Sequence, residues 1–388
     1  MTQEPKIFPY IARLLQGAEV VWKPLGEVAE LKRGTTITKK TSNEGIYPVI
    51  SGGQQPAYYI DQFNRDGETI TVAGSGAYAG FVMYWNEPIF VGDAFSVKAD
   101  EKQVLPRFIY HFLLSIQEKI YDLKSGGGVP HVYAKDVARF VIPLPSLSVQ
   151  QEIVRILDKF TQLEAELEAE LDCRKRQYEY YRNKLLAYEG NEVEWKMLGE
   201  VFTLRNGYTP SKSNNDFWEN GTIPWFRMED IRLGSSILKE AIQTITPEAV
   251  KGKLLPANTI IMATSATVGE HALIEVDFMC NQRFTCFILN KEYQTLFDIK
   301  FLYYYFFLLD EKAKQSVNVS SFPSVQMNEL RKWEIPLPPL EEQQRIATIL
   351  DKFDTLVNSI SEGLPKEIAL RRKQYEYYRE QLLSFPRG

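Results

Sequence analysis

Two long stretches of the chain place apolar residues in alternating steps of three and four, which is the spacing of a coiled-coil seam. The seam of the first stretch consists of Ile153, Ile156, Phe160, Leu163 and Leu167. Glutamates fill outward positions, and neither Gly nor Pro occurs within 149–188. The pattern predicts one helix of roughly 60 Å, at about 1.5 Å per residue. Ser148 and Gln151 have the spacing of a capping box, so we expect the helix to begin there.

The second stretch repeats this seam and then breaks it. Its apolar positions are Ile346, Ile349, Phe353, Leu356 and Ile360. Gly363 and Pro365 follow, and proline removes a backbone donor and clashes with the preceding turn. We therefore predict a helix that begins at Leu340, breaks near Gly363 and resumes at Lys366.

Amphipathic helices of this kind are marginal alone in water, so two in one chain suggest each other as partners. The first leads from one globular segment to the next, and the second begins after that next segment. A packed pair would therefore be antiparallel. The alternative is that each helix packs on its own globular segment.

The globular segments combine short strand patterns with one apolar helix each, which predicts an α+β fold. The expected strands cover 47–51, 69–73, 89–97, 259–264, 272–276 and 284–289. The expected helices cover 106–123 and 299–316. Loops between these elements are rich in Gly, Ser, Thr, Asn, Lys and Arg, which can approach phosphates or base edges.

An internal repeat is the strongest signal in the chain. Trp22-Lys-Pro-Leu-Gly-Glu-Val28 returns as Trp195-Lys-Met-Leu-Gly-Glu-Val201. Each copy later contains Ile-Pro-Leu-Pro, a Gln pair, Ile-Leu-Asp-Lys-Phe, and a basic triplet followed by Gln-Tyr-Glu-Tyr-Tyr-Arg. The separation between copies is 173 positions at the tryptophans, 193 at Ile-Pro-Leu-Pro and 197 at the Tyr-rich motif. The second globular segment and the second helix are therefore the longer ones.

The motifs that flank the globular segments are nearly identical, whereas the interiors share only scattered positions such as Ser75 with Ser265 and Pro130 with Pro323. We interpret this contrast as two readers of different targets on one frame, with simple drift after duplication as the alternative. Residues 14–20 also echo 185–193. The segment 1–21 is therefore expected to close a pseudo-symmetric ring.

Composition narrows the class of protein. The chain has 388 residues, of which 44% are hydrophobic and 24% charged, as in ordinary globular proteins. Three cysteines are too few for a disulfide framework, no apolar run has the length of a membrane span, and 1–10 lacks a signal-peptide core. We expect a cytoplasmic protein. The net charge of −5 counts against a simple DNA-binding protein, unless charge is segregated or a partner supplies basic surface.

Basic loops with Gly and Thr occupy the same place in both copies, and they are the first candidates for contacts with DNA. Ordinary solvated turns are the alternative. These loops contain Lys32, Arg33, Lys39, Lys40, Arg205, Asn206, Tyr208, Thr209, Ser211 and Lys212. Further candidates are Trp225, Arg227, Gln282, Arg283, and two matching loops with Lys124, Ser320 and Ser321. Gln suits adenine and Arg suits guanine, whereas a Trp is more often a packing residue.

Catalytic interpretations find little support in the sequence. The glycines of 74–80 only faintly follow a nucleotide-loop spacing, and the second copy has no equivalent. The Asn/Asp-Pro-Pro-aromatic motif of DNA amino-methyltransferases does not occur, and Cys280 and Cys286 lack a second pair of zinc ligands. We predict no catalytic residue, no metal and no cofactor for this chain.

The repeated motifs together resemble the specificity (S) subunits of type I restriction-modification enzymes. The resemblance covers nearly the whole chain and rests mainly on the helical motifs. It implies a non-catalytic subunit with two target-recognition domains, each for one half of a bipartite asymmetric site in double-stranded DNA. It also implies helices that set the spacer and bind two methyltransferase (M) subunits, which carry S-adenosylmethionine, and restriction (R) subunits for cleavage.

The resulting prediction is an α+β chain with recognition domains at 22–146 and 191–339, separated by two long antiparallel helices at 147–190 and 340–388. The Tyr-rich, basic helix ends are expected to bind the M subunits, because aromatic residues with Arg suit an interface hot spot. These residues are Tyr178, Tyr181, Arg182, Tyr375, Tyr378 and Arg379. Some of the tyrosines could instead complete the coiled-coil core. Two other functions stay open: a stand-alone S-adenosylmethionine-dependent DNA methyltransferase, and a tandem scaffold that binds only proteins.

Overall fold

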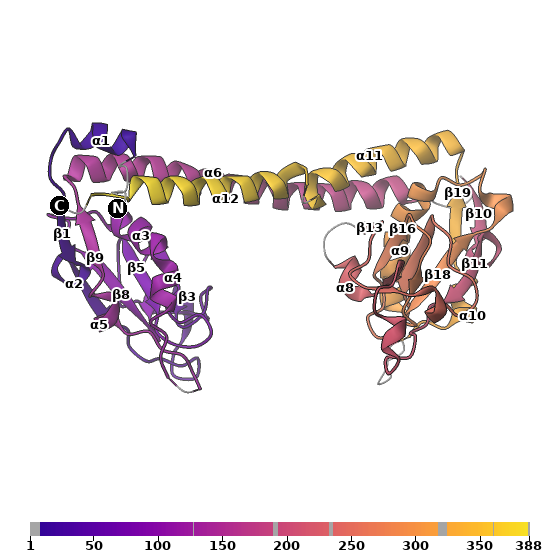
Figure 1. Cartoon of the computed structure of the whole chain (residues 1–388), viewed down its shortest axis with the longest axis horizontal. Coiled ribbons are helices and arrows are strands. Elements are labelled where there is room, and N and C mark those ends of the chain that lie inside the picture. The colour runs from indigo at the N-terminus through magenta and orange to yellow at the C-terminus, as the bar shows by residue number, and fades with distance from the viewer. Residues whose placement is uncertain are drawn as a thin grey trace. The chain divides into compact units, whose positions relative to one another are not determined.

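In the computed structural model, the described residues are 8–126, 128–188, 193–232, 236–316, 324–359 and 361–386. They divide into unit 1, Met1–Glu166 with Ala369–Gly388, and unit 2, Leu167–Ile368 (Figure 1). Each unit holds one α+β domain together with parts of the long helices. We call these domain 1, from β1 to β9, and domain 2, from β10 to β19.

Domain 1 is organised around a sheet in the order β2-β8-β5-β6, beside a smaller sheet β4-β3-β7 and the ladder β1-β9. Its strands are β1 Val21–Pro24, β2 Ala29–Arg33, β3 Glu44–Ile50, β4 Tyr59–Ile60, β5 Thr69–Ala73, β6 Val82–Trp85, β7 Phe90–Val91, β8 Ala94–Ala99 and β9 Val141–Leu144. Its helices are α2 Leu25–Val28, α3 Pro106–Ser115, α4 Gln117–Tyr121 and α5 Ala134–Val137. β5 is buried along its whole length, as its unbroken apolar and Thr sequence requires.

Domain 2 repeats this plan with additional elements. Its sheets have the orders β11-β18-β15-β16-β13, β14-β12-β17 and β10-β19. The strands are β10 Glu194–Met197, β11 Phe202–Asn206, β12 Ile223–Phe226, β13 Ile237–Leu238, β14 Thr244–Ile245, β15 Thr259–Ala263, β16 His271–Ile274, β17 Met279–Cys280, β18 Phe284–Leu289 and β19 Glu334–Leu337. The helices are α7 Leu198–Val201, α8 Met228–Ile231, α9 Ile299–Gln315 and α10 Met327–Leu330, with 3-10 turns η1 Asn215–Phe217, η2 Pro247–Ala249 and η3 Lys291–Tyr293.

The expected strands and apolar helices are confirmed, and two of the strands have the predicted bounds. Two details of the prediction were wrong. The strand expected at 89–97 is divided into β7 and β8, which belong to different sheets. The helix expected at 106–123 is divided at Ile116, whose ψ of 19° lies outside the α-helical range.

The long helices are α6 Leu147–Leu186, α11 Leu340–Asn358 and α12 Gly363–Leu382. The second helix resumes at Gly363 and not at Lys366 as predicted, but the predicted break is confirmed, and Gly363 explains it. Its φ is +70°, and a Cβ there would lie 2.5 Å from the carbonyl oxygen of Thr355. Pro365 then lies in the first turn of α12, where a missing N–H costs nothing.

The capping box expected at Ser148 and Gln151 was wrong. The N–H of Gln150 already donates to the carbonyl of Ser146 (3.0 Å), so the helical hydrogen bonds begin earlier. Gln150 is fully buried. Its amide donates to the carbonyls of Pro145 (2.9 Å) and Gln103 (3.0 Å) and accepts from the N–H of Leu105 (2.9 Å).

Gln343 makes the same three bonds in domain 2. Its amide donates to the carbonyls of Pro338 (2.8 Å) and Leu296 (2.9 Å) and accepts from the N–H of Asp298 (2.9 Å). A single buried glutamine in each copy therefore ties the start of the long helix to the loop that precedes the apolar helix of the domain. The backbone groups that this glutamine binds would otherwise be buried without partners, which is costly. The glutamine therefore stabilises the connection between the domain and the long helix.

The long helices pair in an antiparallel direction within each unit, as the sequence predicted. In unit 1 the ring of Phe160 stacks on Tyr378, and Glu164 binds Arg372. In unit 2 the ring of Phe353 lies against Tyr178 and Tyr181. The N-terminal helix α1 Pro9–Leu15 contributes buried Ile11 and Leu15 to the unit 1 core, beside Leu382 and Leu383.

Candidate nucleic-acid interface

A short turn at the same topological position in each domain connects the small sheet to the large sheet. In domain 1 it is Gly92–Asp93, between β7 and β8, and in domain 2 it is Asn281–Arg283, between β17 and β18. We call these segments the crossover turns. Their first residues make matching bonds, because Gly92 N–H donates to Ile50 O (2.8 Å) and Asn281 N–H to Phe226 O (3.1 Å). The turn of domain 2 is one residue longer.

The strand that ends beside each crossover turn leaves room only for glycine. A Cβ on Gly34 would lie 2.2 Å from the carbonyl oxygen of Gly92, and a Cβ on Gly207 would lie 2.2 Å from that of Asn281. Arg33 and Asn206 immediately precede these glycines, and both are exposed. They therefore occupy equivalent positions beside the two crossover turns.

Domain 1 gathers polar and aromatic side chains at this place. Arg33, Asp93, His131 and Tyr133 line one small hollow of about 60 Å³. The Asp93 carboxylate accepts a hydrogen bond from the Ser75 hydroxyl, and the rings of His131 and Tyr133 stack with centroids 6.0 Å apart. Within the described part of the chain, Arg33 has no ion-pair partner. Its guanidinium is thus available to an external acceptor.

The backbone around the domain 1 turn is held rigidly by two side chains. The amide of Asn64 donates to the carbonyl of Val91 (3.0 Å) and accepts from its N–H (2.8 Å). The guanidinium of Arg65 donates to the hydroxyl of Ser96 (2.7 Å) and to the carbonyl of Arg33 (3.3 Å). Groups fixed in this way can discriminate between ligands, because little ordering is required when they bind.

Domain 2 presents a different set of side chains on the same scaffold. Asn206, Gln282 and Arg283 are exposed, and the side-chain amide oxygen of Gln282 accepts from the Thr209 hydroxyl. The Arg283 N–H donates to the Asn281 side chain (3.0 Å), which orders the turn. The Arg283 guanidinium has no hydrogen bond or ion pair to any residue that the structure describes. The carbonyl of Arg283 accepts from Thr264 N–H (3.0 Å), as that of Asp93 does from Gly74 N–H (3.1 Å).

The predicted Trp225 is a packing residue as well as a pocket wall. It is 4% exposed, its indole N–H donates to the carbonyl of Tyr208 (3.0 Å), and its ring meets Trp218 edge-on. Together with Lys212 and Arg227 these tryptophans line an open pocket of about 340 Å³. Trp225 therefore offers little surface to a partner, whereas the pocket itself is open.

The remaining predicted contacts are dispersed over the two domains. Lys32, Lys39 and Lys40 are exposed, Ser211 bonds to Ser213, and the Lys124 ammonium donates to the carbonyl of Ala77 (3.3 Å). Arg205 donates to the carbonyl of Lys253 (3.1 Å), and the Tyr208 hydroxyl bonds to the backbone of Ala249 and Lys251. Ser320 and Ser321 lie outside the described residues.

Sequence reasoning missed Ser75, Asp93, His131 and Tyr133 as members of the domain 1 site. The alignments of Ser75 with Ser265 and of Pro130 with Pro323 were the available signal. In the structure Ser75 forms an isolated bridge with His131, and Ser265 forms the equivalent bridge with Ser324. The repeat could therefore have indicated two equivalent loop pairs, although not what they surround.

The Tyr-rich helix ends are shared between core and surface. Tyr178 is 4% and Tyr375 is 7% exposed, and each belongs to the core of its unit. Tyr181 remains 43% exposed, and Tyr378 and Arg379 are partly buried. The Arg182 guanidinium lies over the rings of Phe307 (4.2 Å) and Tyr178 (5.4 Å).

A polar joint connects domain 1 to both long helices in unit 1. The imidazole of buried His111 in α3 donates from Nε2 to Asp158 of α6 (2.8 Å) and accepts at Nδ1 from the Tyr375 hydroxyl of α12 (2.8 Å). Burial lowers the pKa of His111, so the neutral form is favoured. Burial of Asp158 opposes ionisation, but hydrogen bonds from His111 and Arg107 lower its pKa overall.

Unit 2 builds the corresponding joint with different residues. The Tyr304 hydroxyl donates to Asp351 (2.7 Å), and Lys300 donates to the other oxygen of Asp351 (2.5 Å). Burial and this hydrogen bond raise the pKa of Tyr304. The hydroxyl of Tyr178, the counterpart of Tyr375, is buried and has no hydrogen-bond partner among the described residues.

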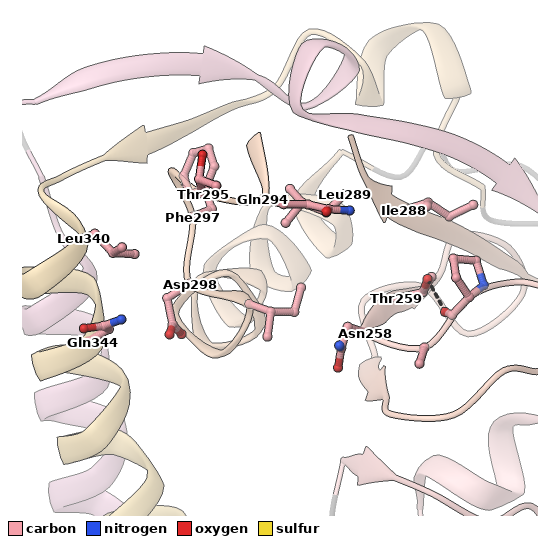
Figure 2. A pocket seen from close by; sticks show the side chains of 13 residues that line it. Asn258, Thr259, Ile288, Leu289, Gln294, Thr295, Phe297, Asp298, Leu340 and Gln344 are labelled. Carbon is pink, nitrogen blue, oxygen red and sulfur yellow. Dashed lines mark hydrogen bonds between the residues drawn. The ribbon is translucent and has the colours of Figure 1, made fainter. Parts of the chain in front are cut away.

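A hollow beside the start of α11 does not suit nucleic acid. Figure 2 shows it between the start of α9, the loop before β15 and the start of α11, with a volume of about 480 Å³. Among the described residues that line this hollow, Asp298 carries a negative charge, and none is a Lys or an Arg. The Asp298 carboxylate caps α9 by accepting from the N–H groups of Lys300 (2.9 Å) and Phe301 (3.0 Å). A phosphate would be repelled here.

The described residues offer neither a cluster suited to a metal ion nor a membrane-spanning helix. No group of three or more His, Cys, Asp or Glu side chains there is arranged to hold a metal ion. No helix of that part of the chain is long and apolar enough to cross a membrane. The crossover turns are the main candidate site because they expose different polar side chains on equivalent backbones.

The architecture is a tandem of equivalent α+β domains, each joined to long helices. A family model described as the type I restriction modification DNA specificity domain matches the chain twice, at residues 18–172 and 191–370. The chain belongs to this family. It is a specificity subunit of a type I restriction-modification system, and its function is DNA sequence recognition.

Individual relatives agree with this assignment. The type I restriction enzyme EcoR124I/EcoR124II specificity subunit of Escherichia coli is 36% identical over 409 residues, which cover 97% of each protein. The EcoprrI specificity subunit of Escherichia coli is 51% identical over 213 residues, which cover 53% of each. The crystal structure of the type I restriction-modification S subunit from M. genitalium aligns with 96% of this chain and 98% of that one, at a TM-score of 0.59 and 18% identity, which shows a shared fold.

Proposed function

We propose that the chain is the non-catalytic DNA reader of a larger complex, in which domains 1 and 2 each recognise one half of a bipartite asymmetric site. The recognition domains are 22–146 and 191–339, and the helices at 147–190 and 340–388 set the spacer between the half-sites. The N-terminal segment 1–21 takes part in the frame by packing α1 against the end of α12. The complex acts in the cytoplasm.

The observation that carries this proposal is the pair of crossover turns. The two turns share backbone hydrogen bonds, neighbouring strands and an obligatory glycine, yet they expose different side chains. Base edges in the major groove are distinguished by such exposed donors and acceptors on a fixed backbone. A common scaffold with different groups therefore supports two half-sites of different sequence.

The partners follow from the same assignment. We propose one S subunit with two M subunits, which carry S-adenosylmethionine, and R subunits that add cleavage. The proposed M-subunit contacts at the helix ends are Tyr181, which is exposed, and Arg182, Tyr378 and Arg379, which are partly exposed. Tyr178 and Tyr375 act from within the core by holding these helix ends in place. The M subunits also supply basic surface that offsets the acidic net charge of this chain.

The test is methylation mapping after co-expression with the M subunit. The expected result is methylated adenine in a split, asymmetric sequence. A chimaera in which 28–139 is replaced by a second copy of 201–332 should methylate a site whose two halves have the same sequence. A single contiguous short site would contradict the proposal. Methyl transfer by the purified chain alone would support a stand-alone methyltransferase, and assembly without sequence preference would support a scaffold.

A further inference from the structure

The crossover turns differ in charge at one equivalent position. Asp93 and Arg283 are the last residues of the two turns, and each accepts at its carbonyl from the loop after the central strand, through Gly74 N–H or Thr264 N–H. The residues that follow them, Ala94 and Phe284, both accept from an obligatory glycine, Gly34 N–H (2.8 Å) or Gly207 N–H (3.1 Å). The two backbones therefore correspond, while the side chains are an acid in domain 1 and a base in domain 2.

Beside each of these side chains lies the residue that precedes the obligatory glycine, which we call its partner position. In domain 1 the partner position is Arg33, which lines the same hollow as Asp93 and makes no ion pair with it. In domain 2 the partner position is Asn206, and the additional turn residue is Gln282. Because an exposed ion pair contributes only about 0–1 kcal/mol, leaving Arg33 and Asp93 unpaired costs the domain little, and both charges stay available to a ligand. They suit a ligand that offers both an acceptor and a donor.

We infer that the crossover turn and the strand end beside it are the base-reading positions of each domain, and that they read different base types. This inference rests on the proposed function. In domain 1 the Arg33 guanidinium donates to guanine, and the Asp93 carboxylate accepts from the amino group of cytosine, so the domain reads a G·C pair. In domain 2 Arg283 reads guanine, and the amides of Gln282 and Asn206 read adenine.

The rigid backbone of the crossover turns favours them, rather than the other basic loops, as the positions that read bases. Asn64 and Arg65 fix the backbone on both sides of the domain 1 turn, and the Asn281 side chain orders the domain 2 turn. The Ser75 hydroxyl orients Asp93, and the Thr209 hydroxyl orients Gln282. Lys39 and Lys40 lie in a turn closed by Thr38, Thr41 and Ser42, but no hydrogen bond among the described residues orients their ammonium groups. They are suited to phosphates, which carry no sequence information.

The experiment compares two conservative variants, Asp93→Asn and Arg283→Gln, in the full chain assembled with its M subunit. Asp93→Asn should relax discrimination about 5- to 150-fold at one G·C position of one half-site and leave the other half-site unchanged. Arg283→Gln should relax discrimination by a similar factor at one guanine of the other half-site. Matched controls are Asp122→Asn in domain 1 and Lys291→Gln in domain 2, which are exposed and away from the turns. They should leave every position unchanged.

Methylation frequency at each single-base variant of the site is the readout, with binding of the assembled complex to the same set of duplexes as a second measurement. Unchanged discrimination in both variants would overturn the inference while the proposed function stands. A uniform loss across all sequences would also overturn it, because that is the signature of a phosphate contact. If the wild-type complex itself showed no split recognition site, the proposed function would fail first.

Discussion

The two identical Gln-Tyr-Glu-Tyr-Tyr-Arg motifs are expected to respond differently to the same deletion of one hydroxyl. Tyr375→Phe removes the donor to His111 Nδ1, at the end of a 2.8 Å hydrogen bond between buried side chains. Tyr178→Phe removes a hydroxyl that is buried without a hydrogen-bond partner among the described residues. The sequence context is the same in both copies, so any difference must come from the tertiary surroundings.

The magnitudes follow from what each change leaves behind. After Tyr375→Phe the Nδ1 atom of a fully buried imidazole has lost its partner, which costs about 1–3 kcal/mol. After Tyr178→Phe, Arg182 and Asp354 lose a neighbouring hydroxyl that makes no hydrogen bond of normal geometry with them, so the cost is smaller, about 0–1 kcal/mol. A cost of about 1–3 kcal/mol corresponds to roughly 5- to 150-fold faster exchange of amides that open with the unit.

Hydrogen exchange measured by mass spectrometry on the full chain separates the two units, because peptides from α3 report on unit 1 and peptides from α9 report on unit 2. Tyr375→Phe should accelerate exchange in α3 and leave α9 unchanged. Tyr178→Phe should leave α3 unchanged and accelerate exchange in α9 clearly less than Tyr375→Phe accelerates it in α3. Equal acceleration in the two units would refute the reasoning, since it would mean that the shared motif and not the His111 contact sets the cost.

Three further predictions concern the frame. Acidification from pH 7.5 to 5.5 should destabilise unit 1, because burial lowers the pKa of His111 in the folded state. The unfolded chain therefore takes up the proton first, near pH 6.5. In exchange measurements of α3, His111→Gln should remove this dependence of stability on pH. Gln343→Leu should cost several kcal/mol (roughly 1–3 for each of three stranded backbone groups), whereas the exposed neighbour Gln344→Leu should change the free energy of unfolding by less than about 0.5 kcal/mol. Gly363→Ala should destabilise unit 2 more than Gly252→Ala, because both have positive φ but only Gly363 has backbone atoms within 3 Å of the added Cβ; similar denaturation midpoints for the two variants would contradict this.

The sequence by itself determined the parts of this protein that depend on local periodicity and on the repeat. The seam from Ile153 onward and its copy from Ile346 determined two long helices, and Gly363 determined where the second one breaks, because these signals act within a few residues along the chain. The β-branched and aromatic residues of 69–73 and 284–289 likewise determined strands. Duplication of the flanking motifs determined that there are two equivalent domains.

Only the tertiary structure decided which side chains meet. Asp93 escaped the sequence analysis because its importance comes from Arg33, 60 positions earlier, and from a glycine that permits close approach of two strands. Trp225 and Tyr375 looked like contact residues, but packing buries them. The Tyr178 hydroxyl differs from the Tyr375 hydroxyl only because, among the described residues, none corresponding to His111 accepts its hydrogen bond. Pairing between distant segments has no local periodicity to reveal it. It is set by the burial of surfaces that become adjacent only once the sheets and helices have assembled.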